Sequence, residues 1–230
     1  MQKFFCIPYA GGSSNIYTPL QQFLNNKVNL FPIELSARGS RIREPLYKHF
    51  TDAVDDVYKY IIDNTDQSDE INICGYSLGS LIGFETIVKL ESNGFRVKSF
   101  IAAANVAPSE EVKLKDYSEN SEQEFMDEIK ELGGVTDELI NNKIFKRLYY
   151  PVIYNDYKLL FEYRRNRRFN KIRADIYVLY GNMDFSHSNI QSWKLHTHAK
   201  CYFEEFEGNH FFINNNYKKF AEVFNEISES

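Results

Sequence analysis

The chain has 230 residues, a length that suits one large domain or two small ones. Hydrophobic residues make up 43% of it, enough for a sizeable core, so wholesale disorder is excluded. Because 27 Lys and Arg face 32 Asp and Glu, the net charge is −5, which is not that of a general nucleic-acid binder. No apolar run approaches the roughly 18 residues that a membrane span needs, so we expect no membrane partner.

Short apolar runs alternate with amphipathic ones along the chain, the pattern of a mostly parallel sheet with helices on both faces. The predicted strands are Phe4–Pro8, Val28–Glu34, Ile71–Tyr76, Lys98–Ala103, Ile176–Tyr180 and Cys201–Phe206. The predicted helices are Tyr17–Asn25, Asp52–Asn64, Leu78–Asn93 and Tyr217–Ser228. Thr51 is the expected cap of the second helix, and Asn93-Gly94 is a normal end for the third.

One region breaks this alternation. From about residue 109 to residue 169 no convincing strand appears, and three charged helical segments are predicted instead: Glu122–Leu132, Glu138–Tyr150 and Val152–Arg164. The region is too long for a loop, so we expect a helical insertion that forms a lid on a single domain spanning residues 1–230.

The cysteines indicate a reducing compartment. Cys6, Cys74 and Cys201 are odd in number and widely spaced, so they predict small buried hydrophobes and no disulfide framework. We also find no metal-ligand spacing, since His196-Thr197-His198 has no further Cys or carboxylate at a suitable distance, and no cofactor motif. No secretory signal is visible, and we expect a cytoplasmic protein.

The strongest local motif is Gly75–Gly79 (GYSLG), which matches G-x-S-x-G. A buried strand precedes it and a helix follows at once, which is the context that a nucleophile elbow requires. Ser77 must sit on a sharp turn, where side chains two residues before and after it would collide, so glycines belong there. The sequence therefore predicts Ser77 as a nucleophile; the alternative is a purely structural turn.

A serine needs a base and an orienting acid, which in G-x-S-x-G hydrolases follow in the order acid, then His. His210 lies just after the last predicted strand, at the sheet edge where Ser77 is expected, and is our predicted base. Asp184 follows the strand before it and is our predicted acid, since residues 104–107 offer no carboxylate. We expect His187, His196 and His198, in a polar stretch, to be solvated.

Two backbone N–H groups are predicted to bind an oxyanion. One is that of Leu78, at the N-terminus of the helix after the elbow. The other comes from the turn that follows the first strand, where we choose Ala10, with Tyr9 and Gly11 as alternatives. A phosphate loop is not indicated, because no Lys-Ser/Thr follows the glycines.

Several segments in this order resemble the stand-alone type II thioesterases of non-ribosomal peptide and polyketide synthesis, which have the α/β-hydrolase fold. The resemblance spans nearly the whole chain. The matching segments are Ile7–Gly12 (IPYAGG), Glu34–Arg41 with Glu44–Leu46 (ELSARGSR…EPL), Gly75–Gly79, Glu131–Gly134 (ELGG), Pro151–Asp156 (PVIYND), Gly181–Asp184 (GNMD) and Gly208–Phe212 (GNHFF). Two departures are Ser36-Ala37 in place of Pro-Gly and Tyr154-Asn155 in place of Arg-Ala.

By this resemblance the protein hydrolyses acyl groups from the phosphopantetheine arm of acyl carrier or peptidyl carrier proteins, which clears mis-primed assembly lines. Residues Arg164 to Arg168 form a basic run in an acidic chain, and Arg165 and Arg168 are candidates for docking an acidic carrier; the alternative is a solvated charge run. Two other functions stay open, a small-molecule esterase or product-releasing thioesterase and a non-catalytic binding module. No large apolar seam is visible, so we expect a monomer.

Overall fold

A six-stranded parallel sheet forms the centre of the molecule. The computed structural model describes residues 1–66, 69–112, 122–131, 133–166 and 168–230, with the backbone alone for 128, 137 and 185–188. The strand order is β2-β1-β3-β4-β5-β6, and each pair of neighbours is parallel. The strands are β1 (Gln2–Ile7), β2 (Val28–Pro32), β3 (Ile71–Tyr76), β4 (Val97–Ala103), β5 (Asp175–Gly181) and β6 (Cys201–Phe206). All six coincide with predicted strands, and the predicted parallel sheet is confirmed.

Each inner strand contributes to two separate cores. In β1, Phe5 and Ile7 pack into one core, while Phe4 and Cys6 pack into the other. This follows from the pleat, which points successive side chains to opposite faces. Because both faces are covered, the inner strands are mostly apolar rather than alternating with polar residues; the buried Asn72 and Ser99 are exceptions that hydrogen-bond to each other.

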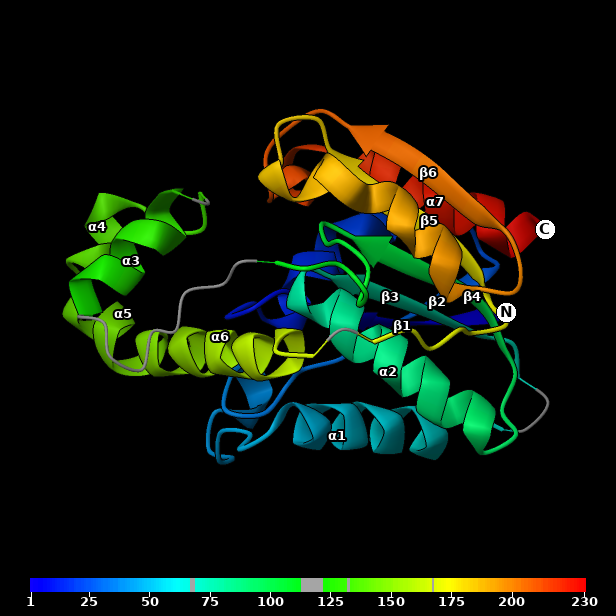
Figure 1. Cartoon of the computed structure of the whole chain (residues 1–230), viewed down its shortest axis with the longest axis horizontal. Coiled ribbons are helices and arrows are strands. Elements are labelled where there is room, and N and C mark those ends of the chain that lie inside the picture. The colour runs from blue at the N-terminus through cyan, green and yellow to red at the C-terminus, as the bar shows by residue number, and fades with distance from the viewer. Residues whose placement is uncertain (67–68, 113–121, 132, 167) are drawn as a thin grey trace.

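Helices cover both faces of the sheet (Figure 1). On the Phe5 side lie α1 (Phe50–Asp63) and α2 (Leu78–Ser92). On the Phe4 side lie η1 (Ser14–Phe23) and α7 (Tyr217–Glu229). Among the described helices, none combines the length and the apolar character that crossing a membrane requires.

Two predicted helices differ in detail. The first is a 3-10 helix, η1, with Pro19 in its interior, where the missing N–H prevents regular α-helical bonding. The second, α1, begins at Phe50 and not after a Thr51 cap. The Asp52 carboxylate instead accepts the backbone N–H of His49 at 3.0 Å, so the expectation for Thr51 was wrong.

A helical insertion leaves the sheet after β4 and returns at β5. It contains α3 (Glu122–Glu131), α4 (Asp137–Ile140), α5 (Lys143–Leu148) and α6 (Tyr150–Arg164). The predicted helix Glu138–Tyr150 is divided, because the Asn142 side chain caps α5 by accepting the N–H groups of Ile144 and Phe145. Leu132, the end of the first predicted helix of the insertion, and Arg167, in the basic run, lie outside the described residues.

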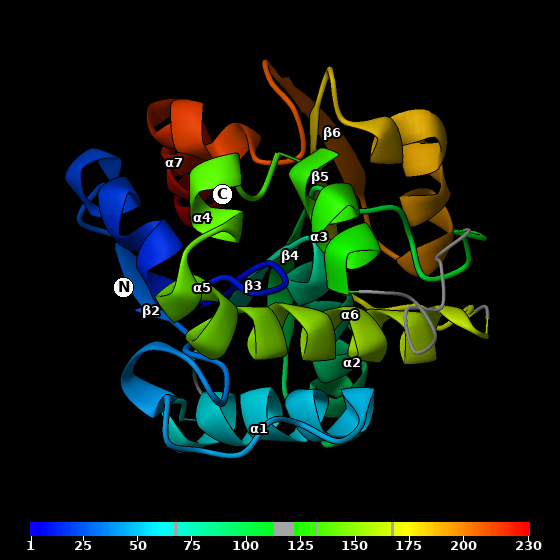
Figure 2. The same cartoon turned by 90° about the vertical axis from the view of Figure 1, so that its left-hand side faces the viewer.

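The insertion has a core of its own. Helices α3–α5 stand to one side of the sheet, and α6 runs back beside α2 (Figures 1 and 2). Phe125 is buried in this core and meets three tyrosines edge-on, with ring centroids 5.2–5.8 Å apart: Tyr150, Tyr154 and Tyr157. Tyr154, one of the two departures from the family pattern at this segment, is therefore a core residue of the insertion.

His196 ties both ends of the insertion to the body. It ends η3 (Phe185–His196), is 0% exposed, and its Nε2 and Nδ1 lie 2.8 Å from Ser109 Oγ and 2.9 Å from the Asn170 carbonyl. A carbonyl only accepts, so Nδ1 carries the proton and Nε2 accepts from Ser109. Burial lowers the pKa of His196. The expectation of a solvated His196 was wrong because its ring packs edge-on against Phe84 and Trp193.

Ala37 adopts a conformation that usually needs glycine. It lies in the loop after β2 with φ of +64°, in the left-handed region where a Cβ is unfavourable. This is one of the two positions at which the chain departs from the Pro-Gly of the family pattern.

We expect Ala37→Gly to raise the free energy of unfolding by about 0.5–1 kcal/mol, because glycine adopts positive φ without strain. The midpoint of thermal unfolding should then rise by about 1–4 °C. Ala199→Gly, at an exposed site without positive φ, is the matched control and should not stabilise. Equal shifts in the two variants would show that Ala37 is not strained.

Candidate active site

Ser77 sits on a sharp turn between β3 and α2. Its φ and ψ are 53° and −116°, a strained backbone for a residue with a side chain. A Cβ on Gly75 would lie 2.2 Å from the Gly79 carbonyl oxygen, and one on Gly79 would lie 2.3 Å from the Ile7 carbonyl oxygen. Both positions therefore require glycine, as the spacing of the motif predicts.

The structure brings Ser77, His210 and Asp184 together from three strand ends. Ser77 Oγ lies 2.9 Å from His210 Nε2, and His210 Nδ1 lies 3.0 Å from Asp184 Oδ2. Asp184 is buried and the His210 side chain is 17% exposed, so the carboxylate is shielded while the imidazole can be reached. With a proton on Nδ1, this imidazole can accept the hydroxyl proton of Ser77.

Two hydrogen bonds that the sequence analysis did not anticipate hold this arrangement. Tyr76 Oη donates to the His210 carbonyl at 2.7 Å, and Asn105 Nδ2 donates to the Ser77 carbonyl at 2.8 Å. Tyr76 is the first variable residue of G-x-S-x-G. Asn105 follows β4, where the sequence offers no carboxylate. Their place next to the motif and at a strand end was the available signal.

The two predicted oxyanion donors lie at the same end of the sheet. Leu78 is the first residue of α2, where backbone N–H groups have no partner within the helix. Ala10 lies in the turn after β1, whose last residue, Ile7, pairs with Gly75 of β3. Of the alternatives for Ala10, Gly11 is already engaged, because its N–H donates to Asp156 Oδ2 at 2.7 Å.

The insertion reaches the segment that carries His210. A Cβ on Gly133 would lie 2.9 Å from Asn209 Nδ2, and one on Gly134 would lie 3.0 Å from the ring of Phe211. The loop between α3 and α4 therefore packs against both neighbours of His210. Gly133 and Gly134 of the ELGG motif therefore lie beside the segment that carries His210.

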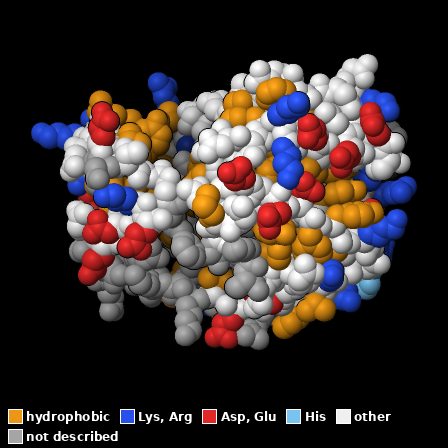
Figure 3. Space-filling model, turned by 90° about the horizontal axis from the view of Figure 1, so that it is seen from above, with side chains coloured by type: hydrophobic (Ala, Val, Ile, Leu, Met, Phe, Trp, Pro, Cys, Tyr) orange, Lys and Arg blue, Asp and Glu red, His pale blue; other side chains and the backbone are white. Residues whose placement is uncertain are grey.

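The basic run at the end of α6 has mixed environments. Arg164 donates to the Val106 and Ala107 carbonyls, and burial lowers its pKa to about 10. Arg165 is exposed, whereas Arg168 lies over the Tyr163 ring. Basic and acidic side chains are interspersed on the face drawn in Figure 3.

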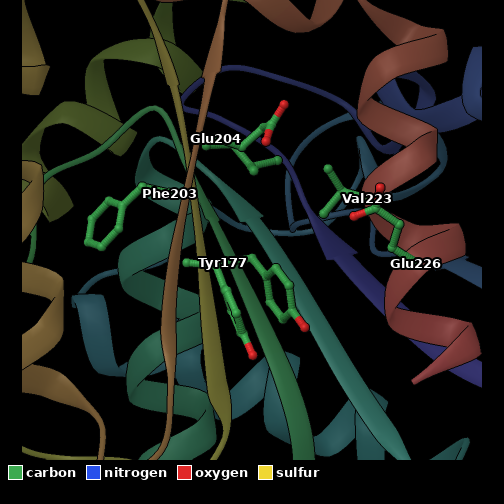
Figure 4. Close-up of a pocket in the computed structure, with 7 residues that line it drawn as sticks. Tyr177, Phe203, Glu204, Val223 and Glu226 are labelled. Carbon is green, nitrogen blue, oxygen red and sulfur yellow. The ribbon is translucent and has the colours of Figure 1, made fainter.

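A separate hollow of about 360 Å³ lies between β5, β6 and α7 (Figure 4). Tyr177 and Tyr202 stack there with ring centroids 4.8 Å apart, and Glu204 and Glu226 complete the rim. None of the predicted site residues lines it.

His198 is exposed, as expected, and the side chain of His187 lies outside the described residues.

Known proteins are similar to this chain over almost its whole length. The family model described as a thioesterase domain matches residues 2–230. The chain is 24% identical to thioesterase PikA5 of Streptomyces venezuelae, covering 99% of this chain and 80% of that protein. It is 26% identical to phenyloxazoline synthase MbtB of Mycobacterium tuberculosis, covering 90% of this chain and 15% of that protein.

Solved structures are similar over almost the full length. ClbQ from the colibactin NRPS/PKS pathway superposes with a TM-score of 0.89 at 26% identity, covering 99% of this chain and 96% of that chain. The type II thioesterase BorB from the borrelidin biosynthetic cluster superposes with a TM-score of 0.86 at 23% identity, covering 99% and 92%. The predicted α/β-hydrolase architecture is thereby confirmed.

Proposed function

Because this chain belongs to the thioesterase family, we propose that it hydrolyses acyl groups from the phosphopantetheine thiol of carrier proteins, using Ser77, His210 and Asp184. The observation that carries this proposal is the pair of hydrogen bonds that joins the Ser77 hydroxyl to His210 and His210 to Asp184. A thioesterase needs an activated nucleophile, and this chain of donors and acceptors supplies one.

In the first half of the reaction Ser77 Oγ attacks the thioester carbonyl carbon, and its proton passes to His210 Nε2. Asp184 stabilises the imidazolium that forms. The carbonyl oxygen becomes an oxyanion that receives hydrogen bonds from the N–H groups of Leu78 and Ala10. Collapse of this intermediate breaks the carbon–sulfur bond, His210 returns its proton to the thiolate, and the acyl group stays on Ser77.

In the second half a water molecule attacks the acyl-Ser77 ester. His210 takes a proton from this water as the tetrahedral intermediate forms, then gives it to Ser77 Oγ as the acid leaves. The free carboxylic acid and the original enzyme result.

The relatives and neighbours support the choice of substrate. PikA5 is named as a thioesterase, ClbQ comes from the colibactin NRPS/PKS pathway, and BorB is named as a type II thioesterase from the borrelidin biosynthetic cluster. We propose that the present chain likewise acts on carrier proteins, removing acyl groups that stall an assembly line. We also propose that residues 1–230 form one domain that acts as a cytoplasmic monomer, and that the insertion at about 109–169 is its lid.

Rates on two substrates test this proposal against a small-molecule esterase. We expect the same site to hydrolyse both a defined acyl-carrier protein and a p-nitrophenyl ester. The value of kcat/KM should be much higher for the acyl-carrier protein than for the ester. A strong preference for the ester would favour the esterase, and a failure of Ser77 to react with a fluorophosphonate serine probe would favour a non-catalytic binding module.

We further propose that Arg165 and Arg168 contribute to carrier docking. Reversing both to glutamate should raise KM for an acyl-carrier protein several-fold and leave KM for a small acyl thioester unchanged, because only the carrier presents an acidic surface. Reversal of Lys27 and Lys48, which are exposed elsewhere on the chain, is the matched control. Equal changes in KM for both substrates would rule out a docking role.

A further inference from the structure

A buried ion pair links the insertion to the turn that holds Ala10. Arg38, in the loop after β2, is 5% exposed, and Asp156, in α6, is 1% exposed. Their side chains form two parallel hydrogen bonds, Nη1 to Oδ2 at 2.6 Å and Nη2 to Oδ1 at 2.8 Å. This is the bidentate geometry that fixes both planes relative to each other.

The same two side chains hold both sides of the turn. Asp156 Oδ2 accepts the Gly11 N–H at 2.7 Å, and Arg38 Nη1 lies 3.3 Å from the Gly12 carbonyl. Ile153, one helical turn before Asp156, presses on the turn as well, since a Cβ on Gly11 would lie 2.4 Å from Ile153 Cγ1.

Asp156 holds the peptide between Ala10 and Gly11 in one orientation. Gly12 N–H donates to the Tyr9 carbonyl at 2.8 Å, and Gly11 has φ of +73°, which together define a type II turn. Type I and type II turns differ by rotation of the peptide between Ala10 and Gly11. In the observed form the N–H of that peptide faces the carboxylate; in the other form the Ala10 carbonyl would face it and be repelled.

A buried ion pair is weak evidence for stability, because taking two charges out of water is costly and packed apolar side chains often do as well. Although burial acts to lower the pKa of Arg38, the charge of Asp156 and its hydrogen bonds raise it above the usual value, so the guanidinium stays charged. A permanently charged fork is thus available to hold the turn.

We propose that Asp156, held by Arg38, is a positioning residue for the oxyanion site: by anchoring the two glycines that follow Ala10, the pair keeps the Ala10 N–H in its place at the strand end, where it can reach the reacting carbonyl oxygen. This inference rests on the proposed function. It assigns a role to the two segments Glu34–Arg41 and Pro151–Asp156, which the proposed chemistry does not otherwise use.

Asp156→Asn tests this role, because it keeps the shape but removes the charge. We expect kcat for a thioester to fall by about 10- to 100-fold, while KM stays within about twofold of wild type. This loss in kcat is no larger than the loss expected when one oxyanion donor is removed. Arg38→Lys keeps the charge but loses the two-pronged hydrogen bonding to Asp156. It should show the same fall in kcat, and it replaces Asp156→Asn in the test if that variant does not fold. Asp56→Asn is the matched control: Asp56 also pairs with an arginine, Arg41, at 2.6 Å, but does not touch the turn.

A trifluoromethyl ketone gives a readout that a merely structural role does not move. Ser77 Oγ adds to the ketone carbon, its proton passes to His210, and the ketone oxygen becomes an oxyanion bound as in the reaction. Its affinity should fall in parallel with kcat in the Asp156 and Arg38 variants and stay unchanged in Asp56→Asn.

Failure of this inference and failure of the proposed function are distinguishable. If wild type neither hydrolyses the thioester nor binds the ketone, the proposed function is wrong. If wild type does both, and the folded Asp156 or Arg38 variant retains kcat and ketone affinity or loses only KM, the positioning role is wrong.

Discussion

Replacing Ser77 with alanine is expected to lower kcat/KM for an acyl-carrier thioester by about four to six orders of magnitude. The hydroxyl is the proposed nucleophile, and its loss leaves His210 with nothing to activate. Backbone strain at residue 77 is retained, because alanine carries a Cβ as serine does, so the fold should persist. Single-turnover hydrolysis, with circular dichroism and thermal unfolding as checks, measures both parts.

Ser92→Ala is the matched control for this variant. Ser92 is the last residue of α2, is exposed, and its hydroxyl donates to the Val88 carbonyl of its own helix. It should keep wild-type turnover. Turnover by Ser77→Ala within tenfold of the Ser92 variant would rule out Ser77 as the nucleophile.

Asp184→Asn is expected to lower kcat by about four orders of magnitude, with little change in KM. The amide of asparagine can donate to His210 Nδ1, which then favours the proton on Nε2. That tautomer cannot accept the Ser77 proton, although the three side chains keep their places. Stopped-flow measurement of acyl transfer checks the expected loss.

The same substitution at the opposite end of β5 controls for charge and packing. Asp175 begins this strand and accepts the Lys200 N–H, far along the strand from Asp184. Asp175→Asn should retain kcat.

The double variant of Ser77 and Asp184 should be no slower than Ser77→Ala alone, because the residues act as a unit. Additive losses would indicate that Asp184 acts independently of Ser77.

Much of the fold could be predicted from the sequence, because buried parallel strands leave an unmistakable pattern. Each of the six apolar runs became a strand, and the glycines at 75 and 79 stand where a side chain would collide with backbone. Parallel strands deliver their ends to one edge, so the order of Ser77, Asp184 and His210 along the chain was enough to predict that they meet.

The rest depends on contacts between residues far apart in sequence, which local pattern does not report. His196 looked solvated because its neighbours are polar, yet its ring fills a gap against Phe84. Arg38 and Asp156 were recognised only as members of two motifs. Their pairing across 118 positions appears only once α6 folds back over the first turn.

The acyl group can be followed by intact-protein and peptide mass spectrometry of carrier and enzyme, quenched while the enzyme turns over a defined acyl-carrier protein. We predict that with wild type the carrier loses the mass of its acyl group and the peptide containing Ser77 transiently gains it, and that neither change occurs with Ser77→Ala. Deacylation of the carrier by Ser77→Ala at the wild-type rate, with no acyl group found at Ser77 in wild type, would contradict this prediction.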